Sequence, residues 1–560
     1  MSKRSVVFIF SRRLLLKYLD SVNIHPIDYV LQALLIMYTT LLSFFSIIVL
    51  LSYFIVRPLW EYLRDPKGLR KYPCINPLAG FTNIGFMWEA YVGIRSKKLY
   101  EMHKTHPVIR IGPNSLSYGS VNAIKDIYGH NSRCTKDVFY EALSGSHFHL
   151  ADVVDKGEHA RKRKMMSSAY ALKNLEGWEY KVADKTERFI KACDAHCTAP
   201  LPDGHVLPDP QDIKFDYRAY SNFFTLDAIA DIGLSERLGF LDAGSDKVIG
   251  EKMDGTIYEV ESYRAGLHAT AKAQALIVWA TEWYDFNSKY VSKILPSFRK
   301  MWKLNEGWND LVYHRATKRL ARYRAGEKLD DFFQALMEDK NGNPNNLEWG
   351  EVIAEVSIML NAGSDTTALA MNNVMVWLLK NPECLSRLRE EVDAVLEPEE
   401  VVAPYDKVKH LPYLRACLDE SLRVTPSTTF GLPRRTPPEG SKILDEWIEG
   451  NTTVSISAYV AHRDPVIFPE PEKFNPDRWL GEKGKELQPY FISFSTGSRG
   501  CIGRNISYLE QTVLLASVVH RYGFALPHPG WEQDRWETTN LMAGPLPLKV
   551  WRRDLGVAKA

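Results

Sequence analysis

The sequence predicts a mainly α-helical fold with a small β region, preceded by a single membrane-spanning helix. Apolar residues at helical spacing recur in long stretches through the chain, whereas short alternating stretches are few. The stretch 29–56 carries no charged side chain. The alternating stretches lie at 108–118 and at about 428–456, and the helical ones lie at 158–176, 178–196, 218–234, 307–324, 329–339 and 347–380.

The uncharged stretch 29–56 has the length and composition of a membrane anchor. It exceeds the ~20 residues that an α-helix needs to span a bilayer, and a helix satisfies its own backbone hydrogen bonds there. A secretory signal would have a shorter apolar core followed by a small-residue cleavage site. Residues 1–28 form a basic N-terminal segment, and its first 19 residues carry no acid, which also fits a mitochondrial presequence.

Prolines at positions 58, 66, 73 and 77 predict a stiff linker over 57–90, so that residues 91–560 form the globular domain. The motifs described below run in one order from 158 to 503, which favours one large domain over several. The net charge of +2 gives no electrostatic argument for nucleic-acid binding. Seven cysteines in a chain of this length do not indicate a disulfide framework.

Cys501 lies in a glycine-containing loop directly before a predicted helix. The helix would point the positive end of its dipole at the sulfur, and nearby N–H groups and a cation lower a thiol pKa. Arg499 is a fixed cation beside it, and Phe494 could shield the sulfur from water. Gly497 and Gly503 let the backbone approach a flat ligand closely. These residue types favour a thiolate ligand over an ordinary buried cysteine.

The pattern Phe494-x-x-Gly497-x-Arg499-x-Cys501-x-Gly503 resembles the haem-binding loop of the cytochrome P-450 family. The resemblance covers nearly the whole chain and implies the cytochrome P-450 fold. It also implies haem b as cofactor, with Cys501 as the axial ligand of the iron and Arg499 facing a haem propionate. A thiolate in that position pushes electron density toward bound oxygen and favours O–O cleavage.

A second part of the resemblance is Ala362-Gly-Ser-Asp-Thr-Thr367, inside the helix predicted over 347–380. Gly363 and Thr366 cost helix propensity, so we expect a local opening of the helical hydrogen bonds beside a ligand. The family motif implies that Asp365 and Thr366 deliver protons to haem-bound dioxygen. The alternative is an ordinary polar helix surface.

Glu420 and Arg423 lie three residues apart on a predicted helix and therefore share one face. In the family such a pair forms a buried network with a later arginine, and Arg478 stands at that place. Because buried charges need full pairing, the resemblance implies a structural triad that holds the haem loop. The alternative is an exposed pair that contributes little to stability.

Three further residues match family contacts to the haem propionates. Arg163 stands where many members have the arginine of a Trp-x-x-x-Arg pair, and His159 replaces the tryptophan. Arg434 resembles another propionate contact. For the run 158–164 apart from Arg163, the alternative is a solvated basic helix face.

The resemblance implies a monooxygenase that inserts one oxygen atom from O2 into a small apolar organic substrate. No flavin or nicotinamide domain is visible after residue 553, so we expect NADPH-derived electrons from NADPH–cytochrome P-450 reductase, with cytochrome b5 as a further donor. Microsomal members keep the haem domain in the cytosol. The resemblance therefore implies a single-pass protein of the endoplasmic reticulum membrane, with the mitochondrion as the alternative.

The chain looks most like filamentous-fungal members, including benzoate 4-monooxygenase-like ones. A tailoring hydroxylation or epoxidation in fungal secondary metabolism is the leading hypothesis. A hydroxylase of aromatic acids or xenobiotics is the alternative, although no basic anchor for a carboxylate is evident from the sequence. A haem-thiolate rearrangement enzyme and a non-catalytic haem protein are further hypotheses, and the Asp365–Thr366 pair speaks against the first. The polar residues at 427–429 and Asn540 either recognise substrate oxygens or satisfy loop backbone.

Overall fold

The computed structural model describes residues 26–167, 169–202, 204 and 207–556. The chain divides into two units, Met1–Gly68 and Leu69–Ala560. Residues 1–25, which include most of the predicted basic segment and all of the presequence-like stretch, lie outside the described residues.

The described part of the first unit is one long helix. It runs through α2 (Pro26–Leu51), a π-helical stretch (Ser52–Val56) and α3 (Arg57–Arg64). From residue 31 to residue 64 it is apolar and long enough to cross a membrane, and almost all of its side chains are exposed. This fits a single membrane anchor.

The helix continues past residue 56 into the segment predicted as a linker. Pro58 is tolerated there because it lies in the first turn of α3, directly after the wider π-helical stretch. The helix ends at Asp65, whose φ of 45° is left-handed, and Pro66 follows. Three prolines of the predicted linker thus lie beyond the anchor, where they do not interrupt it.

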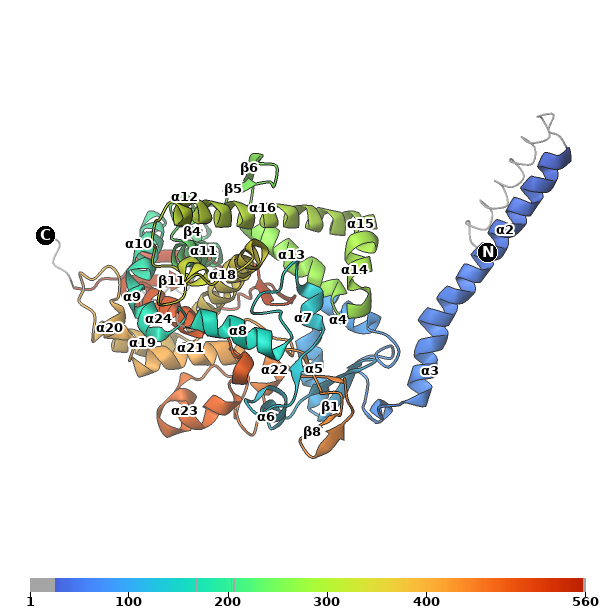
Figure 1. The fold of residues 1–560 in the computed structure, drawn as a ribbon. Helices are drawn as coiled ribbons and strands as arrows, with labels where there is room; N and C mark the ends of the chain where they lie inside the picture. Colours follow the sequence, from blue (N-terminus) through green and yellow to red (C-terminus); the bar gives the residue numbers. More distant parts are fainter. Residues whose placement is uncertain (1–25, 168, 203, 205–206, 557–560) are drawn as a thin grey trace. The chain divides into compact units, whose positions relative to one another are not determined.

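Helices make up most of the second unit, as Figure 1 shows. The periodic stretches of the sequence correspond to helices, most closely at α10 (Glu179–Ala195) and α11 (Tyr217–Leu234). The helix expected from 307 begins earlier, since Pro296 fits the first turn of α16. The remaining α-helices are α4 (Ile84–Val92), α5 (Arg95–His103), α6 (Ala123–Tyr128), α7 (Phe139–Leu143), α8 (Lys156–Ser167), α9 (Leu172–Gly177), α12 (Phe240–Ala243), α13 (Tyr263–Ile277), α14 (Tyr284–Phe286), α15 (Ser292–Ile294), α16 (Pro296–Arg324), α17 (Phe332–Met337), α18 (Trp349–Lys380), α19 (Pro382–Asp393), α20 (Tyr405–Val408), α21 (Pro412–Val424), α22 (Ala458–Ala461), α23 (Gly481–Leu487) and α24 (Arg504–Arg521).

The long helix α18 lies at the centre of the core. It packs against α11, α16, α21 and α24. Their apolar side chains form one cluster, in which Leu360 of α18 and Val513 of α24 are buried. The bounds of α18 confirm the helix predicted over 347–380. Packing in the core places α18 against α24, the helix that follows the cysteine loop.

The β region is small, as predicted. Its largest sheet has the strand order β1-β2-β10-β7-β3, and the expected hairpin at 108–118 is its antiparallel pair β1 and β2. A second sheet has the order β11-β14-β4, and three two-stranded hairpins complete the described strands. The strands are β1 (Val108–Gly112), β2 (Ser115–Tyr118), β3 (Thr135–Lys136), β4 (Ile213–Asp216), β5 (Val248–Glu251), β6 (Ile257–Val260), β7 (Arg434–Arg435), β8 (Ser441–Ile443), β9 (Glu446–Ile448), β10 (Thr453–Ile456), β11 (Tyr522–Ala525), β12 (Arg535–Glu537), β13 (Leu541–Ala543) and β14 (Pro547–Arg552).

The compact second unit begins at Leu69, inside the segment 57–90. The N–H of Arg110 donates to the carbonyl of Pro73 at 2.8 Å, and the N–H of Ile75 donates to the carbonyl of Arg110 at 2.9 Å. This segment therefore lies beside β1 and joins the sheet edge instead of forming a free spacer. Proline fits there because it is tolerated at sheet edges.

Candidate active site

Cys501 lies in the turn between the short 3-10 segment Gly497–Arg499 and α24. Its N–H donates to the carbonyl of Phe494 at 2.8 Å, which closes the loop. Gly497 adopts a φ of 71°, and a Cβ there would lie 2.1 Å from the carbonyl oxygen of Tyr128. Only glycine fits this position. The structure thus places the cysteine at the N-terminal end of a long helix.

The Cys501 side chain is exposed, yet burial raises the pKa of its thiol. A side chain that is accessible but has protein atoms around most of it accounts for both observations. The N–H groups of Gly503 and Arg504 and the charge of Arg163 lower the pKa, but burial outweighs them. A bound metal cation would supply the missing stabilisation of the thiolate.

Five basic side chains gather beside the cysteine loop. Burial and the charges of Arg499 and Lys136 lower the pKa of His159 to about 3. Burial, Arg499 and Arg434 lower the pKa of Lys136 to about 7. Arg163 contributes to both shifts. A bound anionic group would relieve such mutual repulsion between cations, so the cluster is electrostatically suited to one.

The structure brings Arg163, Arg499 and His159 to this cluster from α8 and the loop. Arg163 donates to the carbonyl of Gly500 at 2.5 Å, next to the cysteine. Arg499 donates to the carbonyl of Val154 at 3.2 Å, which ties the loop to the start of α8. His159 is buried on α8, and its low pKa leaves it neutral.

Lys136 is a member of the cluster that sequence reasoning missed. It stands opposite Arg434 where β3 pairs with β7, and its ammonium donates to the carbonyl of Ala151 at 2.7 Å. Arg434 donates to the hydroxyl of Tyr140 at 3.0 Å. Lys136 belongs to no motif of the resemblance. The one sequence feature that could have indicated Lys136 is its position as a lysine within a very short strand.

The helix α18 continues without interruption through the region of Gly363, so the expected local opening does not occur. A Cβ on Gly363 would lie 2.6 Å from Cγ1 of Ile229 on α11. Glycine is therefore required for close packing of the two helices. Thr366 keeps its hydroxyl within the helix, where Oγ1 donates to the carbonyl of Ala362 at 2.9 Å.

Asp365 is buried and turned toward α11 and α13. Its Oδ1 accepts hydrogen bonds from Arg218 at 2.8 Å and Asn222 at 3.2 Å, and lies 3.1 Å from Nε2 of His268. Burial would raise the pKa of Asp365, but the charges of His268 and Arg218 hold it well below its usual range. The carboxylate is therefore ionised and held by three partners, none of which a local motif could reveal.

The structure brings Glu420, Arg423 and Arg478 into contact. Glu420 accepts from Arg423 at 2.8 and 2.9 Å and from Arg478 at 3.0 Å. Trp479 adds a fourth hydrogen bond to the same carboxylate at 2.9 Å. Glu420 and Arg423 are completely buried, so the charges are compensated by contacts within the protein. Ser493, just before the cysteine loop, donates to the carbonyl that precedes Arg423, which connects the triad to the loop.

The polar residues of the two expected substrate-lining loops bond to one another and to α18. Ser427 donates to the carbonyl of Thr366 at 2.8 Å, and Thr428 donates to Asn540 at 3.1 Å. The N–H of Leu541 donates to the carbonyl of Ser427 at 2.8 Å. These contacts favour a role in supporting loop backbone over recognition of substrate oxygens.

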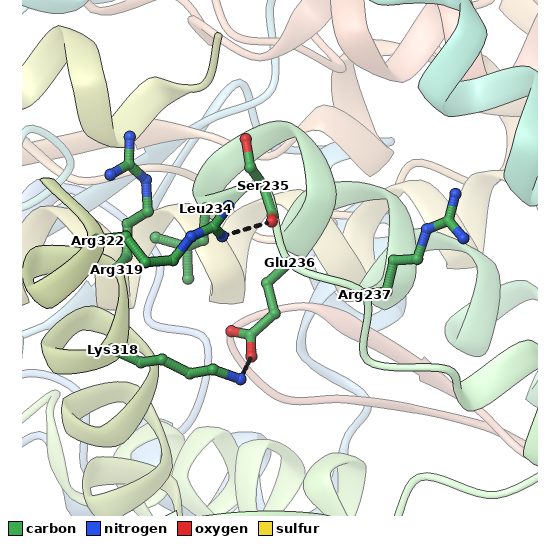
Figure 2. Close-up of a pocket in the computed structure, with 7 residues that line it drawn as sticks. All are labelled: Leu234, Ser235, Glu236, Arg237, Lys318, Arg319 and Arg322. Atoms are coloured by element: carbon green, nitrogen blue, oxygen red, sulfur yellow. Dashed lines mark hydrogen bonds and ion pairs between the residues drawn. The ribbon is translucent and has the colours of Figure 1, made fainter. Parts of the chain in front are cut away.

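A separate pocket of about 180 Å³ lies beside α16 and the C-terminal end of α11 (Figure 2). Lys318 points toward Glu236 and donates to it at 2.8 Å, and Arg322 donates to the carbonyl of Ser235 at 3.0 Å. Arg319 pairs with Asp331 at 2.8 Å. No cysteine or histidine is among the described residues that line this pocket, so it is distinct from the cysteine loop. The lining residues are Leu234, Ser235, Glu236, Arg237, Lys318, Arg319 and Arg322.

The residues around Cys501 fit a haem. The accessible thiol offers a single axial ligand, while the basic cluster offers counter-charges for two propionates. Within the described part of the chain, no group of three histidine, cysteine or acidic side chains could hold a metal ion by itself. A single cysteine ligand beside several cations therefore suits a metal that is held in an anionic macrocycle, as in haem.

Several known proteins are similar to this chain in sequence or in fold. Residues 85–551 match the family model described as cytochrome P-450. The chain is 28% identical over 490 residues to a benzoate 4-monooxygenase of Aspergillus niger, covering 84% of this chain and 90% of the relative. It is 26% identical over 522 residues to a tryprostatin B 6-hydroxylase of Aspergillus fumigatus, covering 91% and 82%. A crystal structure of a cytochrome P-450 matches with a TM-score of 0.63 at 18% identity, over 82% of this chain and 94% of that chain.

The solved structure supports the fold, and the family model covers both α18 and the cysteine loop. Membership implies a haem-thiolate cofactor, O2 and a redox partner. With monooxygenases among its fungal relatives, the chain belongs to the cytochrome P-450 family and is a cytochrome P-450 monooxygenase.

Proposed function

We propose that this monooxygenase inserts one oxygen atom from O2 into an organic substrate with a large apolar part, by hydroxylation or epoxidation. The reaction is a tailoring step of fungal secondary metabolism. The observation that carries the proposal is the exposed Cys501 thiol, which lies at the start of α24 beside a basic cluster. Similarity to a fungal tryprostatin B 6-hydroxylase supports the tailoring role.

Cys501 is the axial thiolate ligand in this proposal. Phe494 accepts its backbone hydrogen bond and packs on Tyr508 at 5.1 Å between ring centroids, which keeps the loop apolar on one side. A Cβ on Gly503 would lie 3.9 Å from the sulfur, an ordinary van der Waals distance, so Gly503 borders the ligand sulfur directly. Haem, when bound, supplies the activation of dioxygen.

The basic cluster holds the propionates. Arg163, Arg434, Arg499 and Lys136 are the cations available to neutralise them. Because its pKa is about 3, His159 contributes a neutral hydrogen-bond donor instead of a charge. These contacts would relieve the repulsion that the four cations impose on one another.

Thr366 and Asp365 have different roles in proton delivery in this proposal: Thr366 orients the proton donor, and Asp365 positions the helix that carries Thr366. The Thr366 hydroxyl lies on the open face of α18 with Ala362 and orients a proton donor there. Asp365 acts as a positioning residue, since its carboxylate is engaged by α11 and α13. A Thr366→Ala variant should consume reductant while forming less product. Unchanged coupling of reductant to product would contradict the role of the hydroxyl.

Electrons come from a separate partner in this proposal, NADPH–cytochrome P-450 reductase, with cytochrome b5 as a second donor. The exposed Lys164 on α8, near the cysteine loop, suits an acidic docking surface. The helix from residue 31 to residue 64 anchors the protein in the endoplasmic reticulum membrane with the second unit in the cytosol. The length and apolar character of that helix support the membrane anchor, and similarity to microsomal members of the family supports the endoplasmic reticulum.

A hydroxylase of aromatic acids or xenobiotics is the second candidate. It is favoured by the similarity to a benzoate 4-monooxygenase over 84% of the chain. Accurate-mass comparison of metabolites from cells with the native protein and with a Cys501→Ala variant separates the two. Loss of a product that contains one more oxygen than an accumulating precursor supports tailoring. If no endogenous metabolite changes, the tailoring proposal fails, and conversion of supplied aromatic acids tests the second candidate.

A further inference from the structure

Tyr508 lies on the second turn of α24, and its side chain is buried. Its hydroxyl donates a hydrogen bond to Oδ1 of Asp419 on α21, and Nε of Arg415 donates to the other oxygen of the same carboxylate at 3.0 Å. Tyr508 and Asp419 are only 6% and 3% exposed, so water competes little for this contact. The structure thus holds a phenol and a carboxylate in direct contact inside the protein.

Tyr508 is also close to the cysteine loop. The ring centroids of Tyr508 and Phe494 are 5.1 Å apart, and the carbonyl of Phe494 accepts the N–H of Cys501 at 2.8 Å. Arg504 connects the same places: its guanidinium carbon lies 5.8 Å from each of the two ring centroids, and its N–H lowers the pKa of the Cys501 thiol. A group bound to the Cys501 sulfur therefore lies within a few residue contacts of the Tyr508 phenol.

The surroundings of Tyr508 favour removal of a proton together with an electron. Burial raises the pKa of Tyr508 and the pKa of Asp419, so the phenol keeps its proton at neutral pH and the carboxylate is a stronger base than an exposed one. A phenol that loses an electron becomes a strong acid, so a carboxylate in hydrogen-bond contact lowers the free-energy cost of oxidation by taking up the proton. Arg415 opposes oxidation, since its guanidinium carbon lies 3.6 Å from the ring centroid, but transfer of the proton to Asp419 keeps positive charge off the ring.

A second pair of the same kind lies at the far end of α24. Tyr522 directly follows this helix, is completely buried, and donates a hydrogen bond from its hydroxyl to Asp194. The 18 residues of α24 rise by about 27 Å, which separates this pair from the cysteine loop. The two pairs share their chemistry and differ in their distance from Cys501. Of the two, the Tyr508 pair is the one within reach of an oxidant bound to the sulfur.

We propose that Tyr508 is a redox-active residue that gives one electron to the haem when the haem has been oxidised and no substrate is in place. The O–H bond of Tyr508 breaks: the proton passes to Oδ1 of Asp419, and the electron reduces the haem by one step. A neutral tyrosyl radical and a protonated carboxyl group remain. One electron from the redox partner, with the proton returned from Asp419, restores the phenol. This inference rests on the proposed function and adds a protective role to the surroundings of the cysteine loop.

Electron paramagnetic resonance of the full-length, haem-loaded protein tests the assignment. The ferric, substrate-free protein is mixed with meta-chloroperoxybenzoic acid, an organic peroxyacid that oxidises haem, and is frozen within milliseconds. Wild-type protein should show the signal of a neutral tyrosyl radical, and the signal should narrow in protein that contains ring-deuterated tyrosine. Tyr508→Phe should lose the signal. Asp419→Asn should lose most of it, because an amide oxygen still accepts the hydrogen bond but does not take up the proton.

Tyr522→Phe is the matched control. It removes an equivalent contact between a tyrosine and an aspartate at the other end of α24 and should leave the radical signal unchanged. The haem of Tyr508→Phe should also bleach faster in the peroxyacid than the haem of wild-type protein or of Tyr522→Phe, as a protective role requires. Circular dichroism and haem content report on folding for each variant. Tyr508→Phe should fold, because it removes a single hydroxyl and Asp419 keeps its contact with Arg415.

A tyrosyl signal that survives in Tyr508→Phe, or the absence of such a signal in wild-type protein, would overturn the assignment. Equal loss of the signal in Tyr522→Phe would do so too, and equal rates of bleaching in wild-type protein and Tyr508→Phe would overturn the protective role. Haem content and reductant-dependent turnover of the same wild-type preparation keep these results separate from the proposed function. A loaded, active enzyme without the Tyr508 radical contradicts this inference alone, whereas a protein without haem contradicts the proposed function.

Discussion

The carboxylate of Asp365 lies 2.8 Å from Nη2 of Arg218, although 147 positions of the sequence separate them. The contact joins α18 to α11 at a completely buried point, and His268 brings α13 to the same oxygen. Three helices thus depend on one ionised carboxylate. Its position next to Thr366 in the sequence couples the packing of this region to the residue that faces the proposed oxygen site.

Arg218→Met should lower the free energy of unfolding by about 3–5 kcal/mol, because it removes the buried arginine of the pair and leaves Asp365 only His268 and Asn222 as partners. The double variant Arg218→Met with Asp365→Asn should recover part of this loss, since both charges are then removed. Urea unfolding of the three proteins measures the difference. Equal losses for the single and the double variant would show that the ion pair does not determine stability here.

Gly363→Ala should destabilise the protein by about 1–3 kcal/mol, because the new methyl group would meet Ile229 on α11. Ile229→Ala removes the opposing side chain and creates a cavity. In the double variant the new methyl group occupies part of that cavity, so its cost should be less than the sum of the two single costs. Thermal unfolding provides the measurement. Additive costs would argue against close helix packing as the reason for glycine.

The haem affinity of wild-type protein relative to that of Lys136→Met should fall as the pH rises above 7, by at most about tenfold per pH unit, because the proton that the Cys501 thiol releases on ligation affects both proteins alike. Burial and neighbouring arginines lower the pKa of Lys136 to about 7 in the protein without a bound anion. Propionates favour the charged ammonium and raise this pKa, so binding above pH 7 takes up a proton and weakens with rising pH. The affinity of wild-type protein relative to that of Lys164→Met, an exposed change on α8, should stay constant between pH 7 and 9.

Glu420→Gln should lower the free energy of unfolding by about 3–5 kcal/mol, because Arg423 and Arg478 would lose their buried counter-charge. Glu486→Gln, at an exposed position of α23, serves as the control and should have little effect. Chemical unfolding followed by far-ultraviolet circular dichroism measures both. A small change for Glu420→Gln would mean that the triad does not hold the loop.

Local patterns of the sequence predicted much of the fold. The helix over 347–380, the hairpin at 108–118 and the uncharged anchor each depend on periodicity or length within one segment. The cysteine loop likewise depends on glycines and a cation within a few residues of Cys501.

Contacts between distant segments could not be predicted in the same way. Arg218, His268 and Lys136 belong to no motif, and only the tertiary fold brings them to the site. The buried hydrogen bond from Arg95 to the carbonyl of Thr538 likewise joins segments 443 positions apart. The expected opening beside Gly363 was wrong because a mid-helix glycine can serve close packing as well as a bulge, and Ile229 decides between them.

The absorbance spectrum of the reduced, carbon monoxide-treated protein tests the central claim most directly, that Cys501 is the thiolate ligand of haem. Full-length wild-type protein should show the long-wavelength Soret band that is typical of thiolate-ligated haem, and Cys501→Ser should lose it. Cys384→Ser, a change of a half-buried cysteine on α19, should keep the band. A Cys501→Ser protein that retains the thiolate band would contradict the account.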